Sequence, residues 1–286
     1  MVLSGVCFGA DAEAFVQTRT CSRAGDTSQI CQPGQEPFPV YWADPCISYY
    51  INREGSDDLP AANGEISAEV EQAVIASFEA WNNTGCSSLG LRYGGLTCND
   101  FTGKREHPNL ARAQHVVTWR ENIWDASSAT IAVTLVNANT QTGIIEDADI
   151  QLNGVDFTFR NLGANSTEPG VVDIRNVLTH EVGHFIGLDH EQDIADATMA
   201  PYAPDGEIIK RDLHADDIQG ACTIYPYTGQ VCSWRTIDDT TCTLIYEGEA
   251  SCAQAPAPTS PPVPWLPFVP ILVGAGVGLG VRRRRR

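Results

Sequence analysis

Three histidines in one short stretch constrain this chain more than any other feature. Segment 180–190 reads HEVGHFIGLDH, so that His180 and His184 stand four residues apart and His190 follows after a glycine. Residues four apart on a helix project from the same face. Gly187 can leave such a helix with a positive φ, which turns the chain back and brings His190 beside the other two. The segment therefore predicts a helix whose end turns sharply toward its own exposed face.

The residue types in this segment predict a catalytic metal centre. Three neutral imidazoles that leave a fourth position open are typical ligands of a catalytic zinc ion. Glu181, next to the first of them, is placed to take a proton from a water and to pass it to a leaving amine. We therefore predict His180, His184 and His190 as metal ligands and Glu181 as the catalytic residue of a peptide-bond hydrolase.

Two other interpretations of the same segment fit it less well. A helix that buries the histidines as core residues would leave three imidazoles and a carboxylate without partners, which is costly. A structural zinc site usually closes its fourth position with Cys or His, and neither stands near this segment beyond the three histidines.

With Met199 nine residues after the third histidine, the segment resembles the signature of the metzincin zinc peptidases. Residues 197–202 (ATMAPY) resemble their Met-turn, which implies that Met199 supports the metal site from below. A helix at 67–81, a last strand at 147–153 and a closing helix from Leu213 resemble the matrixin branch. The resemblance covers about residues 40–225 and implies an α+β fold, with a mixed twisted sheet, an active-site helix at 173–187 and a C-terminal helix.

Two positions depart from the matrixin pattern. Glu191 stands where matrixins usually have Ser and where astacins have Glu. We expect Glu191 to pair with a nearby cation such as the mature N-terminus. Tyr202 lies three residues after Met199, whereas the Tyr ligand of astacins and serralysins lies two after the Met, so Tyr202 is not counted as a ligand.

The segment 129–136 is rich in β-branched residues and predicts a strand. Its place in the resemblance makes it the edge strand above the cleft, where an extended peptide can add to free backbone groups. The expected substrate-binding residues are then Thr130, Ile131, Ala132, Val133 and Thr134. The alternative is another strand inside the sheet. The loop at 201–211 is expected to wall the pocket just past the scissile bond.

Further elements follow from periodicity. Residues 46–52, 89–93 and 115–119 read as strands. Ser67 is placed to cap a helix, and Asp173 a second one. Spacings of four, four and three predict a buried face in the first helix, formed by Val70, Val74, Phe78 and Trp81. His107 and His115 have no carboxylate at a recognisable spacing and are interpreted as ordinary residues.

Ten cysteines, none in a zinc-type Cys-x-x-Cys pattern, predict disulfides and an oxidising compartment. Cys86 and Cys98 bracket a strand and are expected to pair locally. Without Cys7 and Cys252, which belong to the two chain ends, eight cysteines remain. A structural role is expected for Cys21, Cys31 and Cys46, with blockage of the metal by one of them as the alternative.

The net charge of −18 argues against a nucleic-acid partner. We expect a secreted or cell-surface protein of a bacterial envelope that is a monomer. The resemblance also makes a bound calcium ion an expectation.

The two ends of the chain differ from its middle. Residues 1–14 resemble the end of a secretory signal whose start is truncated, and 15–40 read as a disulfide-pinned segment before a catalytic domain at 41–226. A Cys-containing extension (227–252) and a Pro-rich linker (253–262) follow. Residues 263–281 carry no charge and, as a helix, would span about 28 Å. Five arginines at 282–286 end the chain.

This arrangement resembles the C-terminal sorting signals of myxobacterial secreted proteins, which implies that the tail is removed and that Cys252 receives a lipid. A permanent membrane anchor is the alternative. For the whole chain we predict a zinc-dependent endopeptidase that cleaves extended polypeptides or peptides. Two other classes stay open: a surface-attached zinc-binding protein without turnover, against which the intact Glu181 argues, and a zinc hydrolase of small amides.

Overall fold

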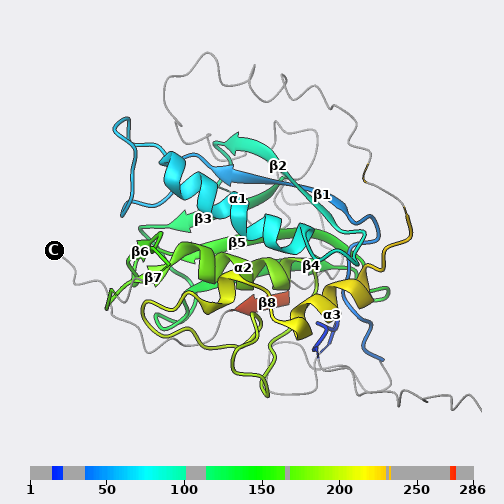
Figure 1. Cartoon of the computed structure of the whole chain (residues 1–286). Helices are drawn as coiled ribbons and strands as arrows, with labels where there is room; N and C mark the ends of the chain where they lie inside the picture. Colours follow the sequence, from blue (N-terminus) through cyan, green and yellow to red (C-terminus); the bar gives the residue numbers. More distant parts are fainter. Residues whose placement is uncertain are drawn as a thin grey trace, which may run out of the picture.

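A computed structural model describes residues 15–21, 36–100, 114–164, 168–229, 232 and 271–274. Its centre is a mixed sheet, shown in Figure 1. Five strands come from the middle of the chain and lie in the order β2-β1-β3-β5-β4, and a sixth, β8, pairs with β4. The strands are β1 (Cys46–Asn52), β2 (Gly90–Thr97), β3 (His115–Arg120), β4 (Ala132–Ala138), β5 (Ile145–Asn153) and β8 (Ile271–Gly274).

The sheet is parallel except on the side of the predicted substrate edge. β1 runs parallel to β2 and β3, and β3 runs parallel to β5. β4 is antiparallel to β5, and β8 is antiparallel to β4. The mixed sheet and the helices agree with the α+β class that the sequence predicts.

Helices α1 (Ala68–Asn82) and α2 (Ile174–Phe185) pack side by side on one face of the sheet. The short turn η1 (Ile209–Arg211) contacts α2, and α3 (Ala215–Ile224) follows it. A second, two-stranded sheet joins β6 (Phe159–Arg160) to β7 (Val172–Asp173), and α2 begins directly after β7.

The predicted caps and the predicted core face of α1 are confirmed. The hydroxyl of Ser67 accepts a hydrogen bond from the Val70 N–H, and the Asp173 carboxylate accepts one from the Asn176 N–H. Such caps satisfy backbone donors that a helix start leaves unpaired. The four residues predicted to face the core have no exposed surface: Val70, Val74, Phe78 and Trp81. The ring of Phe78 stacks on that of Tyr49 from β1, with centroids 3.5 Å apart.

The predicted local disulfide between Cys86 and Cys98 is wrong. Cys86 is bonded to Cys222 of α3, Cys46 is bonded to Cys232, and Cys98 has a free thiol. The physical reason is that β2 lies between Cys86 and Cys98. Eight extended residues hold its ends more than about 20 Å apart, whereas a disulfide needs Cα atoms within about 7 Å. Cys7, Cys31, Cys242 and Cys252 lie outside the described residues.

β4 differs in two ways from the predicted strand. It begins at Ala132 rather than 129 and continues to Ala138, so Thr130 and Ile131 precede it. It is also not the outermost strand, because residues 133–136 pair with β8. In the uncharged stretch 263–281 the four described residues thus form a strand, not part of a helix. Within the described parts of the chain, no helix is both long and apolar enough to cross a membrane.

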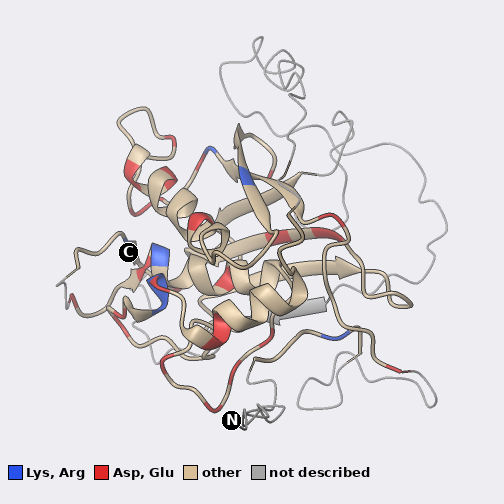
Figure 2. Ribbon diagram, turned by 45° about the vertical axis from the view of Figure 1, so that its right-hand side comes forward, with Lys and Arg blue, Asp and Glu red and all other residues tan. Residues whose placement is uncertain are grey.

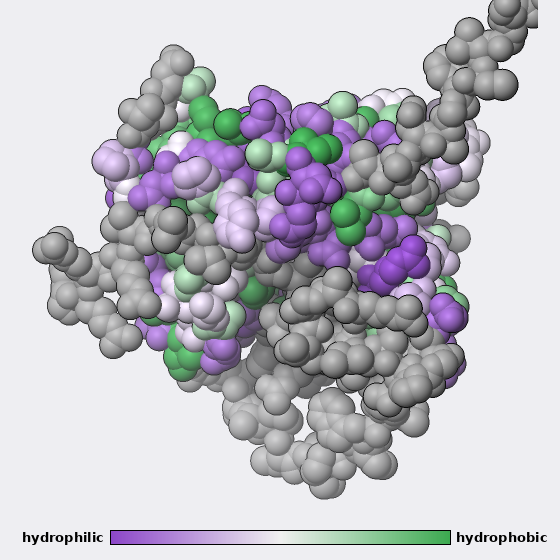
Figure 3. All heavy atoms as spheres, turned by 90° about the horizontal axis from the view of Figure 1, so that it is seen from below, coloured by the Kyte–Doolittle hydropathy of each residue, from purple (hydrophilic) through white to green (hydrophobic). Residues whose placement is uncertain are grey.

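Acidic side chains outnumber basic ones along the ribbon in Figure 2, as the composition requires. On the face seen in Figure 3, hydrophobic residues are scattered among hydrophilic ones wherever grey atoms do not cover it. This distribution is ordinary for the surface of a folded domain.

Candidate metal centre

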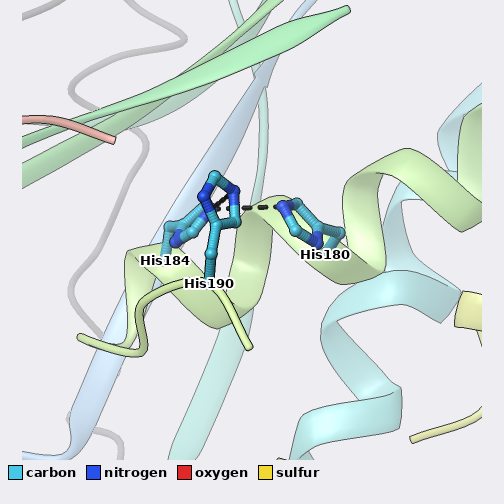
Figure 4. A group of neighbouring side chains, drawn as sticks. All are labelled: His180, His184 and His190. Carbon is cyan, nitrogen blue, oxygen red and sulfur yellow. Dashed lines mark hydrogen bonds between the residues drawn. The ribbon is translucent and has the colours of Figure 1, made fainter. Parts of the chain in front are cut away.

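The structure brings the three predicted ligands together. The Nε2 atom of His184 lies 3.2 Å from Nε2 of His180 and 3.2 Å from Nε2 of His190 (Figure 4). A tetrahedral zinc ion with Zn–N bonds of 2.0–2.1 Å holds its nitrogen ligands about 3.3 Å apart. These two separations are close to what that ion requires, and the ligand atoms of all three histidines lie within 4.8 Å of one another. Across the described ranges, no other group of His, Cys, Asp or Glu side chains is arranged to hold a metal.

Backbone carbonyls orient two of the imidazoles. Nδ1 of His180 lies 2.6 Å from the carbonyl oxygen of Thr198, and Nδ1 of His184 lies 2.9 Å from that of Leu188. A carbonyl oxygen only accepts, so each Nδ1 carries the hydrogen and each Nε2 keeps its lone pair. Both rings thus present the nitrogen that a metal needs.

Burial keeps these ligands neutral. Desolvation, followed by repulsion from His190, lowers the pKa of His180 and of His184 well below the usual range. Desolvation also lowers the pKa of His190. Neutral imidazoles bind metals without first releasing a proton.

The turn after α2 has the geometry that the glycine predicts. Gly187 has a φ of +97°, and a Cβ placed there would lie 2.3 Å from the carbonyl oxygen of Val40. Only glycine fits a positive φ with so close an approach of another backbone. The chain then returns so that His190 faces the helix.

Other segments satisfy the carbonyls that the helix end leaves open. The indole of Trp42 donates to the Phe185 carbonyl, and the hydroxyl of Tyr225 donates to that of Ile186. The backbone N–H of Thr18 donates to the Gly187 carbonyl, and its hydroxyl donates to the Leu188 carbonyl. The N-terminal segment 15–21 therefore lies beside the loop that carries His190.

The Met-turn lies under the cluster, and α3 holds it there. Met199 is buried, and its sulfur lies 2.2 Å from where a Cβ on Gly183 would be. The carboxylate of Asp217 accepts hydrogen bonds from the N–H groups of Thr198 at 2.7 Å and Met199 at 3.1 Å. The carbonyl oxygen of Thr198 in turn accepts the hydrogen bond from Nδ1 of His180. Asp217 thus positions a ligand through the turn.

Glu181 lies under β4. One oxygen of its carboxylate, Oε2, accepts a hydrogen bond from the Thr134 hydroxyl at 2.7 Å. Both side chains are completely buried. Thr134, predicted as a substrate-binding residue, therefore uses its side chain to hold the carboxylate. Ala132 and Val133 lie on β4, Thr130 stands before it, and Ile131 lines a pocket.

That pocket opens beside His180. It encloses about 230 Å³ including its open mouth. Its walls come from Ile131 just before β4, from α2, from the loop after the Met-turn and from η1. Lys210 is buried there, with its ammonium bonded to the Tyr202 carbonyl and 3.0 Å from each carboxylate oxygen of Glu207. The lining residues are Ile131, Asn176, Val177, His180, Ala200, Pro201, Tyr202, Ala203 and Lys210. Tyr202, which the sequence does not predict as a ligand, lines this pocket.

The structure also bears on the predictions made for Glu191 and for His115. Glu191 is buried, and its Oε1 accepts a hydrogen bond from the Asp193 N–H at 2.6 Å. No ion pair of Glu191 occurs among the described residues, so its pairing with a mature N-terminus stays a prediction. His115 has a carboxylate partner that its sequence neighbourhood does not show, because Asp147 of β5 lies 3.0 Å away. His107 lies outside the described residues.

The sequence model of the matrixin family matches residues 113–226, from β3 to the end of α3. Together with the three-histidine cluster, this match supports a metzincin-like metallopeptidase. No protein of curated function matches the chain in sequence. Among solved structures, the "GM1 bound form of the ECX AB5 holotoxin" is 14% identical with a TM-score of 0.37, over 65% of this chain and 82% of that one. This likeness is too weak to bear on function.

Sequence reasoning selected the three histidines that the structure brings together but missed the residues that hold them. Thr18 and Asp217 give no signal of their own, because each acts on backbone groups of another segment. Asp217 stands in a helix start, where an acidic residue is expected for its own sake. Only the hydrogen bonds from the Thr198 and Met199 N–H groups show that Asp217 also holds the Met-turn.

Proposed function

We propose that this protein is a zinc-dependent endopeptidase that hydrolyses extended polypeptides, with His180, His184 and His190 as ligands and Glu181 as the general base and then the general acid. The observation that carries the proposal is the 3.2 Å spacing of the ligand nitrogens, next to a carboxylate held by Thr134. When bound there, zinc would polarise the scissile carbonyl and acidify a water.

The chain's own residues supply the proton transfers and the positioning. The Glu181 carboxylate accepts the proton of the attacking water and later donates it to the leaving amine. The Thr134 hydroxyl orients that carboxylate, and Met199 and Asp217 keep the ligand rings in place. Because these groups are buried and already partnered, little reorganisation accompanies the reaction.

The substrate would lie antiparallel to β4, with backbone hydrogen bonds to residues 130–134. The side chain just past the scissile bond would enter the pocket beside His180. Its mostly apolar wall favours an apolar side chain of modest size, since Lys210 is already neutralised by Glu207.

Several features beyond the site belong to the same proposal. The disulfides fit an oxidising, extracellular setting, and the uncharged stretch at 263–281 fits attachment to the cell surface. Contact with a membrane through the tail or a lipid on Cys252, a bound calcium ion and a monomeric state remain sequence-based expectations.

The test is cleavage of an unfolded protein such as casein by the full chain, with and without a chelator, beside Glu181→Ala. We expect about one zinc per chain, cleavage that the chelator stops and added zinc restores, and a variant slower by about 100- to 10,000-fold. Zinc content measures whether the variant still holds its metal. A variant that loses its zinc would not test the role of Glu181, and Glu181→Gln would then replace it.

The strongest alternative is a zinc-binding surface protein without turnover. It predicts bound zinc in the wild type and in Glu181→Ala with no cleavage by either. A small-amide hydrolase predicts turnover of acyl amides with intact casein. The wall formed by β4 beside the metal site favours the endopeptidase over both, because it offers backbone groups along an extended chain.

A further inference from the structure

The C-terminal part of the chain returns to the candidate site. Strand β8 (Ile271–Gly274) pairs with β4 in antiparallel register, with Ile271 opposite Val136 and Gly274 opposite Val133 (Figure 1). Between α3 and β8 lie 46 residues, so this contact joins distant segments. The pairing uses the side of β4 that faces away from β5, since β4 lies between the two in the sheet.

The same side of β4 is where the proposed substrate would bind. β8 reaches Thr134, which lies opposite Val273 and whose hydroxyl holds the carboxylate of Glu181. In the structure with β8 in place, Glu181 has no exposed surface. A substrate at residues 130–134 would need the outward-facing backbone N–H and C=O groups of β4, and β8 pairs with the same side of β4 at residues 133–136. Substrate and β8 therefore exclude each other.

The direction of β8 also matches that of a substrate. Both run antiparallel to β4, so the tail approaches the catalytic carboxylate as an extended peptide would. Backbone pairing is largely indifferent to side chains, and a segment of this chain can therefore replace a foreign one.

We propose that residues 271–274 occupy the substrate edge of β4 in cis and hold the proposed peptidase in an autoinhibited state. The evidence for this inference is the pairing of β8 with β4, and it rests on the proposed function because only a peptidase would be inhibited. A tethered segment is present at an effective concentration in the millimolar range, so even weak strand pairing competes with a dilute substrate. Release of the tail, by cleavage or by transfer to a membrane, would then free the edge.

The experiment compares three full-length proteins: wild type, Leu272→Pro/Val273→Pro and the control Ala255→Pro/Ala257→Pro. Neighbouring residues of a strand point their N–H groups to opposite sides, so the first pair of prolines removes one donor toward β4 whichever residue provides it. The control places two prolines in a linker that is already rich in proline. Casein cleavage and hydrogen exchange of the amides at 132–138 are both measured.

We expect the Leu272→Pro/Val273→Pro protein to cleave about tenfold faster than wild type and control, with faster amide exchange in β4. Equal cleavage rates in all three proteins would overturn the inference and leave the proposed function standing. Tail trimming in wild type that Glu181→Ala abolishes would also overturn it, because the tail would then be a substrate. If none of the three cleaves, the proposed function fails, and unchanged exchange at 132–138 would overturn the pairing by itself.

Discussion

The two sides of the candidate site are built differently. On the ligand side, α2, the turn at Gly187 and the Met-turn are held by buried contacts to Thr18, Trp42 and Asp217. On the proposed substrate side, β4 is paired with a four-residue strand from the C-terminal part of the chain. A metal needs ligands whose geometry does not change. A substrate edge needs a partner that can be exchanged, because the same backbone groups must serve it.

The largest expected effect on stability comes from a substitution at the end of α2. Gly187→Ala adds a Cβ 2.3 Å from the Val40 carbonyl oxygen at a φ of +97°. We expect a loss of about 3 kcal/mol or more in the free energy of unfolding, measured with urea. Gly85→Ala is the matched control, because Gly85 has a φ of +78° but nothing within 4 Å of the added carbon. We expect it to lose about 1 kcal/mol. Equal losses would show that the approach to Val40 is unimportant.

A second test asks whether Asp217, which holds the Met-turn, contributes to zinc affinity. Asp217→Asn replaces a buried carboxylate that accepts from three backbone N–H groups, those of Thr198, Met199 and His214. An amide nitrogen cannot accept, so at least one donor loses its partner. We expect about 2 kcal/mol of destabilisation and a zinc affinity about 10- to 100-fold weaker.

Asp216→Asn, one residue earlier, is the matched control. The carboxylate of Asp216 has no such role in the turn, and burial together with the charges of Asp217 and Glu191 raises its pKa. Zinc affinity should be unchanged in this variant, as titration with a competing chelator would measure. If both variants weaken zinc equally, Asp217 acts only through the charge of the helix start.

The third test measures how the free energy of unfolding of the metal-free protein depends on pH. The pKa values of His180 and His184 are lowered in the folded state, so the unfolded chain takes up protons first when the pH falls below about 6.5. Their contribution to stability is full above that pH and is lost as the pH decreases. We expect a slope approaching about 1.4 kcal/mol per pH unit for each histidine. Urea unfolding with a chelator at pH 8, 6.5 and 5 measures it, and His184→Gln should reduce the slope.

The smallest change concerns the substrate side. Thr134→Val keeps the shape of the side chain but removes the hydroxyl that orients Glu181. We expect kcat to fall about tenfold with KM little changed, since a positioning contact is lost and the edge backbone is kept. The pH dependence of kcat should shift as well, because the hydroxyl stabilises the ionised carboxylate. A change confined to KM would indicate that Thr134 serves the substrate instead.

Local sequence patterns predicted much of the fold. Alternation predicted β1 at its observed bounds, and spacing predicted the buried face of α1. The ends of other strands shifted by several residues, as for β4, because pairing with neighbours determines where a strand ends. The disulfide of Cys86 was mispredicted for the same kind of reason: its partner Cys222 is 136 residues away.

What the sequence determined by itself is the cluster of three candidate ligands, because the four-residue helical spacing and the glycine that follows act within eleven residues. Tertiary structure decided what surrounds that cluster: Thr18 on the loop before His190, Asp217 under the Met-turn and β8 on the proposed substrate edge. Each of these contacts engages a backbone group of another segment, and a backbone group is the same in every residue. Only the folded chain selects which of them meet.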